Sequence, residues 1–133
     1  MIKIMKTILL TLLLSIKVIG LSQSLEEVKE YIYSQDSLEH KEIVLKQAIL
    51  ETGWFKSWNC RERKNLFGFR WKPWVSENNK MGYIIFDTWK ESVDYYVRWQ
   101  GRHYKGGDYY EFLEEVGYAT STTYVDKLKS IKI

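Results

Sequence analysis

The stretch QAILETGWF, Gln47–Phe55, decides the fold of this chain. It closes an apolar helical run, carries one carboxylate at Glu51, and turns at Gly53. Glycine is typical of the position just past a helix end. Val44, Ala48 and Glu51 are spaced by four and then three residues, so they share one face of a helix. The pattern therefore places a lone acid at the end of a helix that is apolar on most sides.

An acid in that position is expected to keep its proton. Burial disfavours the charged carboxylate, and the helix dipole disfavours a negative charge in the last turn by about 0.3–1 kcal/mol. We expect Trp54, Phe55 and Trp58 to supply an apolar wall. Glu51 is therefore a candidate general acid, because that role needs a carboxyl still protonated near neutral pH. A solvated glutamate at a frayed helix end is the alternative, and periodicity alone leaves it open.

The segment 1–22 has the pattern of a cleaved signal peptide. Two lysines precede an apolar core, Ile8–Ile16, and Gly20 and Ser22 are small residues at the spacing that a signal peptidase reads. The apolar run is short for a membrane span, although an uncleaved anchor is the alternative. We predict a signal peptide at 1–22, one domain at 23–133 without a membrane span, and export to a periplasm or to the cell exterior.

Charge and metal-ligating residues argue against several classes of function. The net charge of +3 arises in segment 1–22, which holds Lys3, Lys6 and Lys17 and no acid, so the rest of the chain is neutral overall. This balance gives no electrostatic reason to expect nucleic acid as a partner. Cys60 is single and forms no intrachain disulfide. The two histidines, His40 and His103, lack metal-ligand spacing. We expect no metal, no cofactor and a monomer.

Capping signals predict a mainly helical domain. The expected helices are 25–34, capped by Ser24; a second capped by Asp36 and ending near Thr52; 89–103, capped by Thr88; a fourth from Asp108 to Gly117; and a last one from Thr120 or Ser121 to about Ile131. The inner side of the third helix is marked by Trp89, Val93, Tyr96, Val97 and Gln100. Leu66–Trp71 and Tyr83–Asp87 are rich in aromatic and β-branched residues, which favours a β-hairpin or a long ordered loop.

Aromatic rings gather around the predicted hairpin: Phe67, Phe69, Trp71, Trp74 and Tyr83. Sugars present apolar faces that stack on such rings, so a ring-lined groove suits a polysaccharide. Core packing is the alternative and accounts for roughly half of the rings in a domain this small. Trp71 and Trp74 are the two that we expect to be exposed, because they flank Pro73.

Four ordered motifs carry a family resemblance: QAILETGWF, KNLFGFRW, YIIFDTWKESVDYY and GYATSTTYVDKL. In that order they resemble the glucosaminidase domain of bacterial cell-wall hydrolases, glycoside hydrolase family 73, which includes flagellar peptidoglycan hydrolases and autolysins. The match spans roughly residues 38–131. The resemblance implies an α+β, mainly α, lysozyme-like helical domain with a small β-hairpin lobe flanking a substrate groove. It also implies cleavage of the β-1,4 bond after N-acetylglucosamine in peptidoglycan glycan strands.

The resemblance assigns roles to individual residues. Glu51 matches the essential acid of the family's Glu-Ser/Thr-Gly motif, in agreement with the expectation from its helix position. Gln47 would line the same face, and Tyr118 matches a substrate-contacting ring of the Tyr-Ala-Thr motif. Asn65, Leu66, Phe67 and Gly68 match the Asn-Leu-Phe-Gly segment that shapes the groove floor. Tyr124 matches a second, more structural tyrosine, and we include it with Trp71 among the expected substrate-binding side chains.

The segment between Trp71 and Tyr83 is shorter than in many family members, which carry a second acid on a longer hairpin. Glu77 is the acid in this segment and the candidate for that catalytic role, ahead of Glu62 and Asp87. Without a second acid, two mechanisms remain open. A water activated by a distant base inverts the anomeric centre, or the substrate's own acetamido group acts as nucleophile.

Two other classes of function compete with an endo-β-N-acetylglucosaminidase. A lytic transglycosylase shares the lysozyme-like fold and a single glutamate, and it yields 1,6-anhydro products. A non-catalytic module that binds peptidoglycan would use the aromatic rings alone. The binder has no need of an acid at an unfavourable helix end, which favours the enzyme.

Overall fold

Residues 23–72, 79–80 and 82–133 are described by the computed structural model of this protein, and they form a mainly helical domain. The predicted signal peptide, Pro73, Trp74 and Glu77 lie outside these residues. The elements in chain order are α2 (Leu25–Tyr33), α3 (Lys41–Thr52), η1 (Asn59–Arg63), β1 (Asn79–Lys80), β2 (Tyr83–Ile84), α4 (Trp89–His103), α5 (Tyr109–Glu115) and α6 (Tyr124–Ser130). Among the described residues, no helix combines the length and apolar character that crossing a membrane requires.

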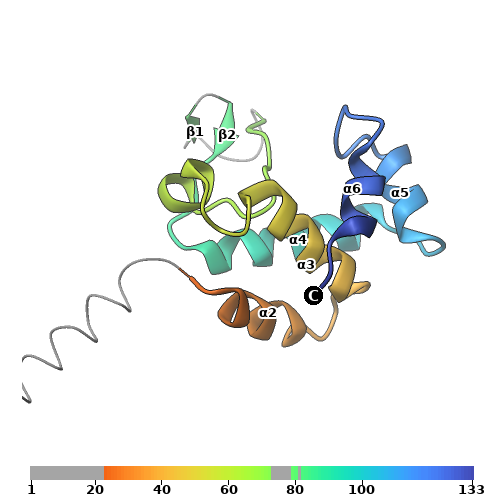
Figure 1. The fold of residues 1–133 in the computed structure, drawn as a ribbon, viewed down its shortest axis with the longest axis horizontal. Helices are drawn as coiled ribbons and strands as arrows, with labels where there is room; N and C mark the ends of the chain where they lie inside the picture. The colour runs from red at the N-terminus through yellow and green to blue at the C-terminus, as the bar shows by residue number, and fades with distance from the viewer. Residues whose placement is uncertain (1–22, 73–78, 81) are drawn as a thin grey trace, which may run out of the picture.

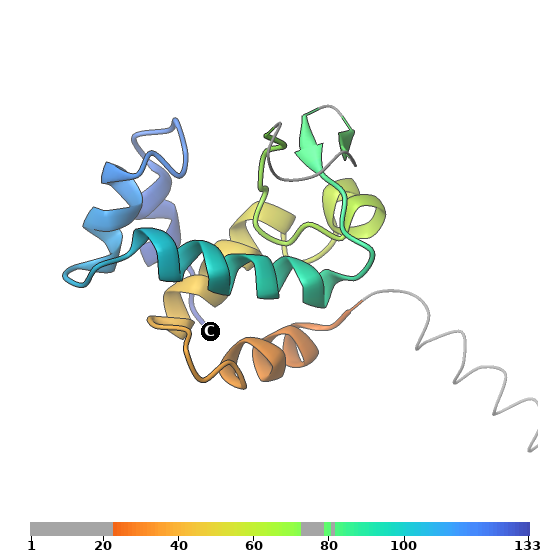
Figure 2. The ribbon, with the colours of Figure 1, turned by 180° about the vertical axis from the view of Figure 1, so that it is seen from behind.

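Helices α3 and α4 cross the middle of the domain, and two smaller lobes stand at its ends (Figure 1). One lobe holds η1 with the β1–β2 ribbon, and the other holds α5 and α6. Helix α2 covers the opposite side of α3 and α4, as the view from behind also shows (Figure 2). The core between them is apolar and includes Val28, Ile32, Leu45, Ala48 and Val93. This arrangement leaves the end of α3 between the two lobes.

Three of the predicted helix starts are confirmed by their capping bonds. The side chains of Ser24, Thr88 and Asp108 each accept a hydrogen bond from the backbone N–H three residues later. Each bond satisfies an unpaired donor of the first turn. The predicted end of α3 is confirmed too, since Gly53 is its C-cap, with a φ of 55° in the left-handed region. Glycine adopts that conformation readily, so local sequence chemistry fixes these boundaries.

The predicted start of α3 at Asp36 is wrong, because the helix begins at Lys41 after His40. A tertiary contact explains the delay. The Gln100 side chain on α4 accepts a hydrogen bond from the Glu39 N–H at 2.8 Å and donates one to the Glu39 carbonyl at 2.8 Å. The N–H and the carbonyl of Glu39 both bond to this side chain and therefore do not form helical hydrogen bonds.

The last helix also begins later than predicted, at Tyr124 rather than near Thr120 or Ser121. The Ser121 hydroxyl accepts a hydrogen bond from the Thr123 N–H at 3.2 Å and lies 2.8 Å from the Thr123 hydroxyl. Such local side-chain bonds compete with helix formation. They hold the preceding residues in a turn.

Leu66–Trp71, predicted to belong to a β-hairpin or a long ordered loop, is mostly an ordered loop that pairs with the ribbon at its end. The described ribbon pairs β1 with β2 antiparallel, and Arg70 contributes only an isolated bridge to Tyr83. Backbone bonds join only the end of the segment to the ribbon, from the Trp71 N–H to the Gly82 carbonyl at 2.7 Å and from the Ile84 N–H to the Phe69 carbonyl at 3.1 Å. Side chains hold its beginning: the Leu66 N–H donates to the Ser92 hydroxyl at 3.3 Å, and the Phe69 N–H donates to Asn65 Oδ1 at 3.1 Å. The aromatic pattern of this segment thus reflects a packed loop.

Candidate active site

Glu51 lies in the last turn of α3, and its carboxyl lies against Gly68 of the packed loop. A Cβ atom placed on Gly68 would stand 2.7 Å from Glu51 Oε2. Burial raises the pKa of Glu51 above the ordinary value for a glutamate, while a hydrogen bond from Tyr124 and the positive charge of Arg70 lower it. Because burial is the largest of these influences, the site favours a protonated carboxyl.

The loop that presents Gly68 is held by the Asn65 side chain. Asn65 Nδ2 donates to the carbonyls of Phe69 at 2.9 Å and Ile84 at 3.1 Å, and Oδ1 accepts from the Phe69 N–H at 3.1 Å. Asn65 and Phe67 are each 1% exposed. Both side chains were expected to bind substrate. Asn65 instead fixes the loop that carries Gly68, whereas Phe67 is one of the residues that line the cleft described below.

Buried polar side chains continue from Glu51 into the core. The Tyr124 hydroxyl, which hydrogen-bonds to Glu51, accepts a hydrogen bond from Gln47 Nε2 at 3.3 Å. Gln47 Oε1 in turn accepts a short bond from the Tyr96 hydroxyl. Gln47 and Tyr96 are fully buried. Their polar atoms are therefore satisfied only within this chain of bonds.

The same chain of bonds ends at the loop before α3. The hydroxyls of Tyr96 and Tyr109 lie 2.6 Å apart, and Gln100 Nε2 donates to Tyr109 at 3.0 Å and to the Glu39 carbonyl. The sequence placed Tyr96 and Gln100 on the inner side of α4 but gave no sign of a link to Glu51. Spacing reveals which side chains are buried, whereas their partners on other elements come only from the fold.

Tyr118 forms one edge of the site. Its hydroxyl donates to the Phe67 carbonyl at 2.7 Å, and its ring stacks on Tyr124 with centroids 5.8 Å apart and planes 20° apart. The resemblance predicts that Tyr118 contacts substrate and that Tyr124 is more structural. Tyr124 is 7% exposed and bonded to Glu51, whereas Tyr118 is half-buried and borders a cleft.

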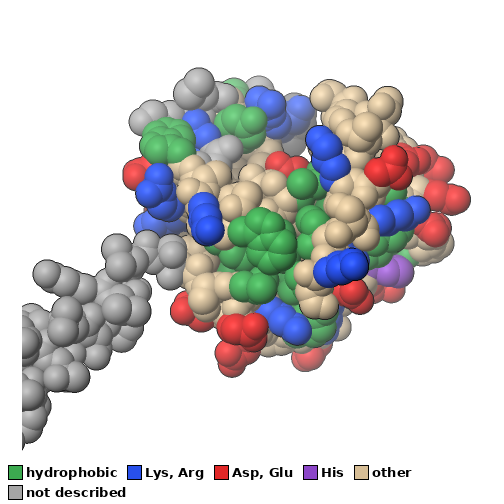
Figure 3. Space-filling model, in the orientation of Figure 1, with side chains coloured by type: hydrophobic (Ala, Val, Ile, Leu, Met, Phe, Trp, Pro, Cys, Tyr) green, Lys and Arg blue, Asp and Glu red, His purple; other side chains and the backbone are tan. Residues whose placement is uncertain are grey.

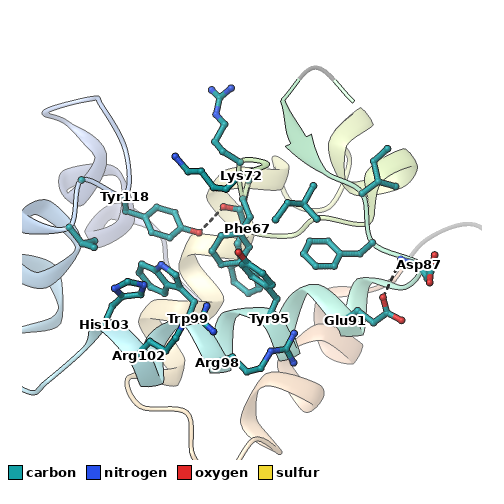
Figure 4. A pocket seen from close by; sticks show the side chains of 18 residues that line it. Phe67, Lys72, Asp87, Glu91, Tyr95, Arg98, Trp99, Arg102, His103 and Tyr118 are labelled. Atoms are coloured by element: carbon teal, nitrogen blue, oxygen red, sulfur yellow. Dashed lines mark hydrogen bonds between the residues drawn. The ribbon is translucent and has the colours of Figure 1, made fainter. Parts of the chain in front are cut away.

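A cleft of about 1010 Å³ opens beside Gly68 and Tyr118 (Figure 4). Helix α4 forms one wall, and the loop at Gly68–Lys72 with Ile84–Asp87 forms the other. Tyr124, which hydrogen-bonds to Glu51, borders a second hollow of about 350 Å³ together with Ala119–Thr122. Residues that contact Glu51 therefore border both hollows, which suits an acid acting midway along an extended ligand.

The remaining predicted site residues have mixed placements. Of the three rings expected to form an apolar wall, Trp54 and Trp58 are 49% and 42% exposed, whereas Phe55 is buried. Trp71 is half-buried at the foot of the β lobe, and its backbone N–H donates to the Gly82 carbonyl at 2.7 Å. Asp87 borders the far end of the cleft. In the described ranges, no three His, Cys, Asp or Glu side chains are grouped as a metal site would require.

Removing the Tyr124 hydroxyl should raise the pKa of Glu51 further, because that hydroxyl stabilises the carboxylate. An acid that must be protonated then stays active to higher pH. In Tyr124→Phe we therefore expect the alkaline limb of the pH profile of kcat/KM to move upward. Tyr33→Phe, at an exposed position on α2, is the control. A limb that stays in place or moves downward contradicts the expectation.

Tyr96→Phe should cost stability, because it leaves Gln47 Oε1 buried without its donor. Stranding a buried polar atom costs about 1–3 kcal/mol. Urea denaturation followed by circular dichroism measures the loss in free energy of unfolding. Tyr95→Phe makes the same chemical change on the same helix, at a half-buried side chain. An equal loss of unfolding free energy in both variants would show that the bond to Gln47 adds no stability beyond that of an ordinary tyrosine hydroxyl.

The fold and the site together define a class: a lysozyme-like helical domain that holds a half-buried carboxyl of raised pKa beside a cleft is suited to glycoside hydrolysis. The glucosaminidase family model, described as mannosyl-glycoprotein endo-beta-N-acetylglucosaminidase, matches residues 29–132. The chain therefore belongs to the glucosaminidase family, of the glycoside hydrolase family 73 type.

Solved structures resemble this chain as well. A crystal structure of peptidoglycan hydrolase from Sphingomonas sp. A1 is 27% identical, with 66% of this chain and 70% of that chain covered and a TM-score of 0.54. A mutant of a peptidoglycan hydrolase from the same organism is 20% identical, with 78% and 83% covered and a TM-score of 0.55, which bears on the fold alone. No curated protein matches the chain.

Proposed function

We propose that this protein is an exported peptidoglycan hydrolase that cleaves the β-1,4 bond after N-acetylglucosamine, with Glu51 as general acid. The observation that carries the proposal is the Glu51 carboxyl, whose pKa is raised by burial and which lies against Gly68 at the edge of the cleft. Family membership supports the glycosidic reaction, and the Sphingomonas structure at 27% identity supports peptidoglycan as substrate. The pattern of residues 1–22 supports export.

Glu51 would donate its proton to the glycosidic oxygen as the bond to the anomeric carbon breaks. Tyr124 stabilises the carboxylate that this step leaves, through the hydrogen bond that already lowers its pKa. Two routes would complete the reaction: the substrate's acetamido oxygen attacks the anomeric carbon, or a water activated by a distant base does. Glu77 stays a candidate base outside the described residues.

Mass spectrometry of the products from purified peptidoglycan tests the proposal. Residues 23–133 should release soluble fragments with reducing N-acetylglucosamine ends, and Glu51→Gln should release none. Anhydro ends would make the protein a lytic transglycosylase, and binding to the wall without release would make it a binding module. Proton NMR of the first product separates the two mechanisms, since the acetamido route retains the anomeric configuration and direct attack by water inverts it.

A further inference from the structure

One face of α4 runs along the cleft and carries two arginines. Glu91, Tyr95, Arg98 and Arg102 follow at steps of four, three and four residues, which places them on a single helix face. All four border the cleft. Both arginines are exposed, so the face presents their guanidinium groups to solvent along the cleft.

Cations outnumber acids in the cleft. Its charged side chains are Arg70, Lys72, Arg98 and Arg102, which we call the cationic rim, against Asp87 and Glu91. The two acids lie together at one end, where Glu91 accepts a hydrogen bond from the Asp87 N–H at 3.3 Å (Figure 4). Arg98 and Arg102 lie further along α4, away from that end.

The rim cations have no acidic partner within the described ranges. The one ion pair found there joins Lys46 to Glu42 at 3.7 Å, on α3. Arg70 instead packs over the Tyr83 ring at 4.3 Å, and Arg98 lies 6.0 Å from the Tyr95 ring. The rim is also a local excess of positive charge, because the chain after Ser22 has a net charge of zero. Figure 3 shows acids and bases mixed over the face that Figure 1 presents.

We propose that the cationic rim binds the carboxylates of the peptides carried by the glycan strand. This inference rests on the proposed function. Peptidoglycan is a neutral sugar chain with short peptides on alternate sugars, and those peptides end in free carboxylates. Guanidinium groups bind carboxylates through paired, charge-assisted hydrogen bonds. The rings of the cleft suit the sugars, and the rim suits the peptide, so the cleft would select sections of strand whose peptides are intact.

The size of the cleft agrees with a ligand larger than a sugar pair. Its volume is about 1010 Å³. Small-molecule sites measure about 300–1000 Å³, so this cleft lies at the upper end of that range. An anionic phosphodiester polymer attached to the wall is the other source of negative charge. Carboxylate and phosphate both pair with arginine, so the substrates in the test must separate them.

The test compares binding by Glu51→Gln with binding by Glu51→Gln that also carries Arg98→Gln and Arg102→Gln. Binding is measured on three preparations that are fixed to beads: wall free of phosphate polymers, glycan strands from the same wall after an amidase has removed the peptides, and wall that retains the polymers. We expect the arginine substitutions to raise the half-saturating concentration about two- to twentyfold on the peptide-bearing wall, as two exposed ion pairs would. On the peptide-free glycan they should change nothing.

The matched control is Lys127→Gln with Lys129→Gln on α6, which removes the same charge from outside the cleft. An equal effect of the arginine substitutions on the first two preparations, or no effect on either, overturns the proposal. If the arginine substitutions weaken binding only to the phosphate-bearing wall, the proposal is also overturned, and the rim binds the phosphate polymer instead. Binding is measured without cleavage, so the two proposals can fail separately. If the hydrolase proposal alone is wrong, the wild type releases no products while the arginine substitutions still weaken binding to the peptide-bearing wall.

Discussion

Glu51→Gln is expected to lose about 10²- to 10⁴-fold in kcat, the usual contribution of a general acid. The amide keeps the shape of the side chain and can still contact Tyr124, but it has no proton of suitable acidity for the leaving oxygen. KM should change little, because the same surfaces remain. The rate of release of soluble fragments from purified peptidoglycan measures the effect.

The same substitution should stabilise the protein relative to the wild type as the pH rises. Burial raises the pKa of Glu51 above its unfolded value. Its contribution to stability is therefore fully present below the unfolded pKa and is lost as the pH rises through the folded pKa. Glutamine has no such dependence, so the difference in free energy of unfolding should move in favour of the variant across that interval.

Two results would contradict this account of Glu51. One is near-wild-type lysis by the variant, which would remove Glu51 from the chemistry. The other is a difference in unfolding free energy that stays constant with pH, which would mean that the wild-type carboxyl titrates as if exposed. Glu30→Gln on α2 is the matched control, because it makes the same change at an exposed acid with no role in the site.

Local patterns predicted the end of α3 better than they predicted its start. Glu51 and Gly53 follow from helical period and capping, which depend on residues within two turns. The start of α3 depends on a bond between Glu39 and Gln100, which are far apart in the sequence, so no local pattern announces it. The segment after Asn65 has a strand's composition, yet only its end pairs with the ribbon, and the Asn65 side chain bonds the backbone of Phe69.

The support behind Glu51 was hidden from sequence reasoning for a related reason. Tyr96, Tyr109 and Gln100 are spaced as ordinary core positions, and their polar atoms meet only because α4, α5 and the loop before α3 converge. The cationic rim could not be predicted from the sequence for the same reason. Its α4 arginines are regular in spacing, but Arg70 and Lys72 join them only across the cleft.

Gly68→Ala is expected to lose about 100-fold in activity at a modest cost in stability, because a shift of about 1 Å at a catalytic group is enough for such a loss in rate. The new methyl group would stand 2.7 Å from Glu51 Oε2, closer than such contacts allow. The flexible partner is the end of the Glu51 side chain, so the carboxyl moves aside at little cost in free energy. The rate of fragment release and urea denaturation measure the two effects.

Gly53→Ala separates this displacement from backbone strain. Both glycines have positive φ, 66° at Gly68 and 55° at Gly53. Alanine in that left-handed region costs about 1–2 kcal/mol at either position. A Cβ atom on Gly53 would meet nothing within 4 Å. Urea denaturation should therefore give similar losses for the two variants, while kcat falls steeply in Gly68→Ala alone. Parallel losses of activity would trace the effect to strain, whereas the expected divergence would mean that glycine is needed at position 68 to leave room for the acid.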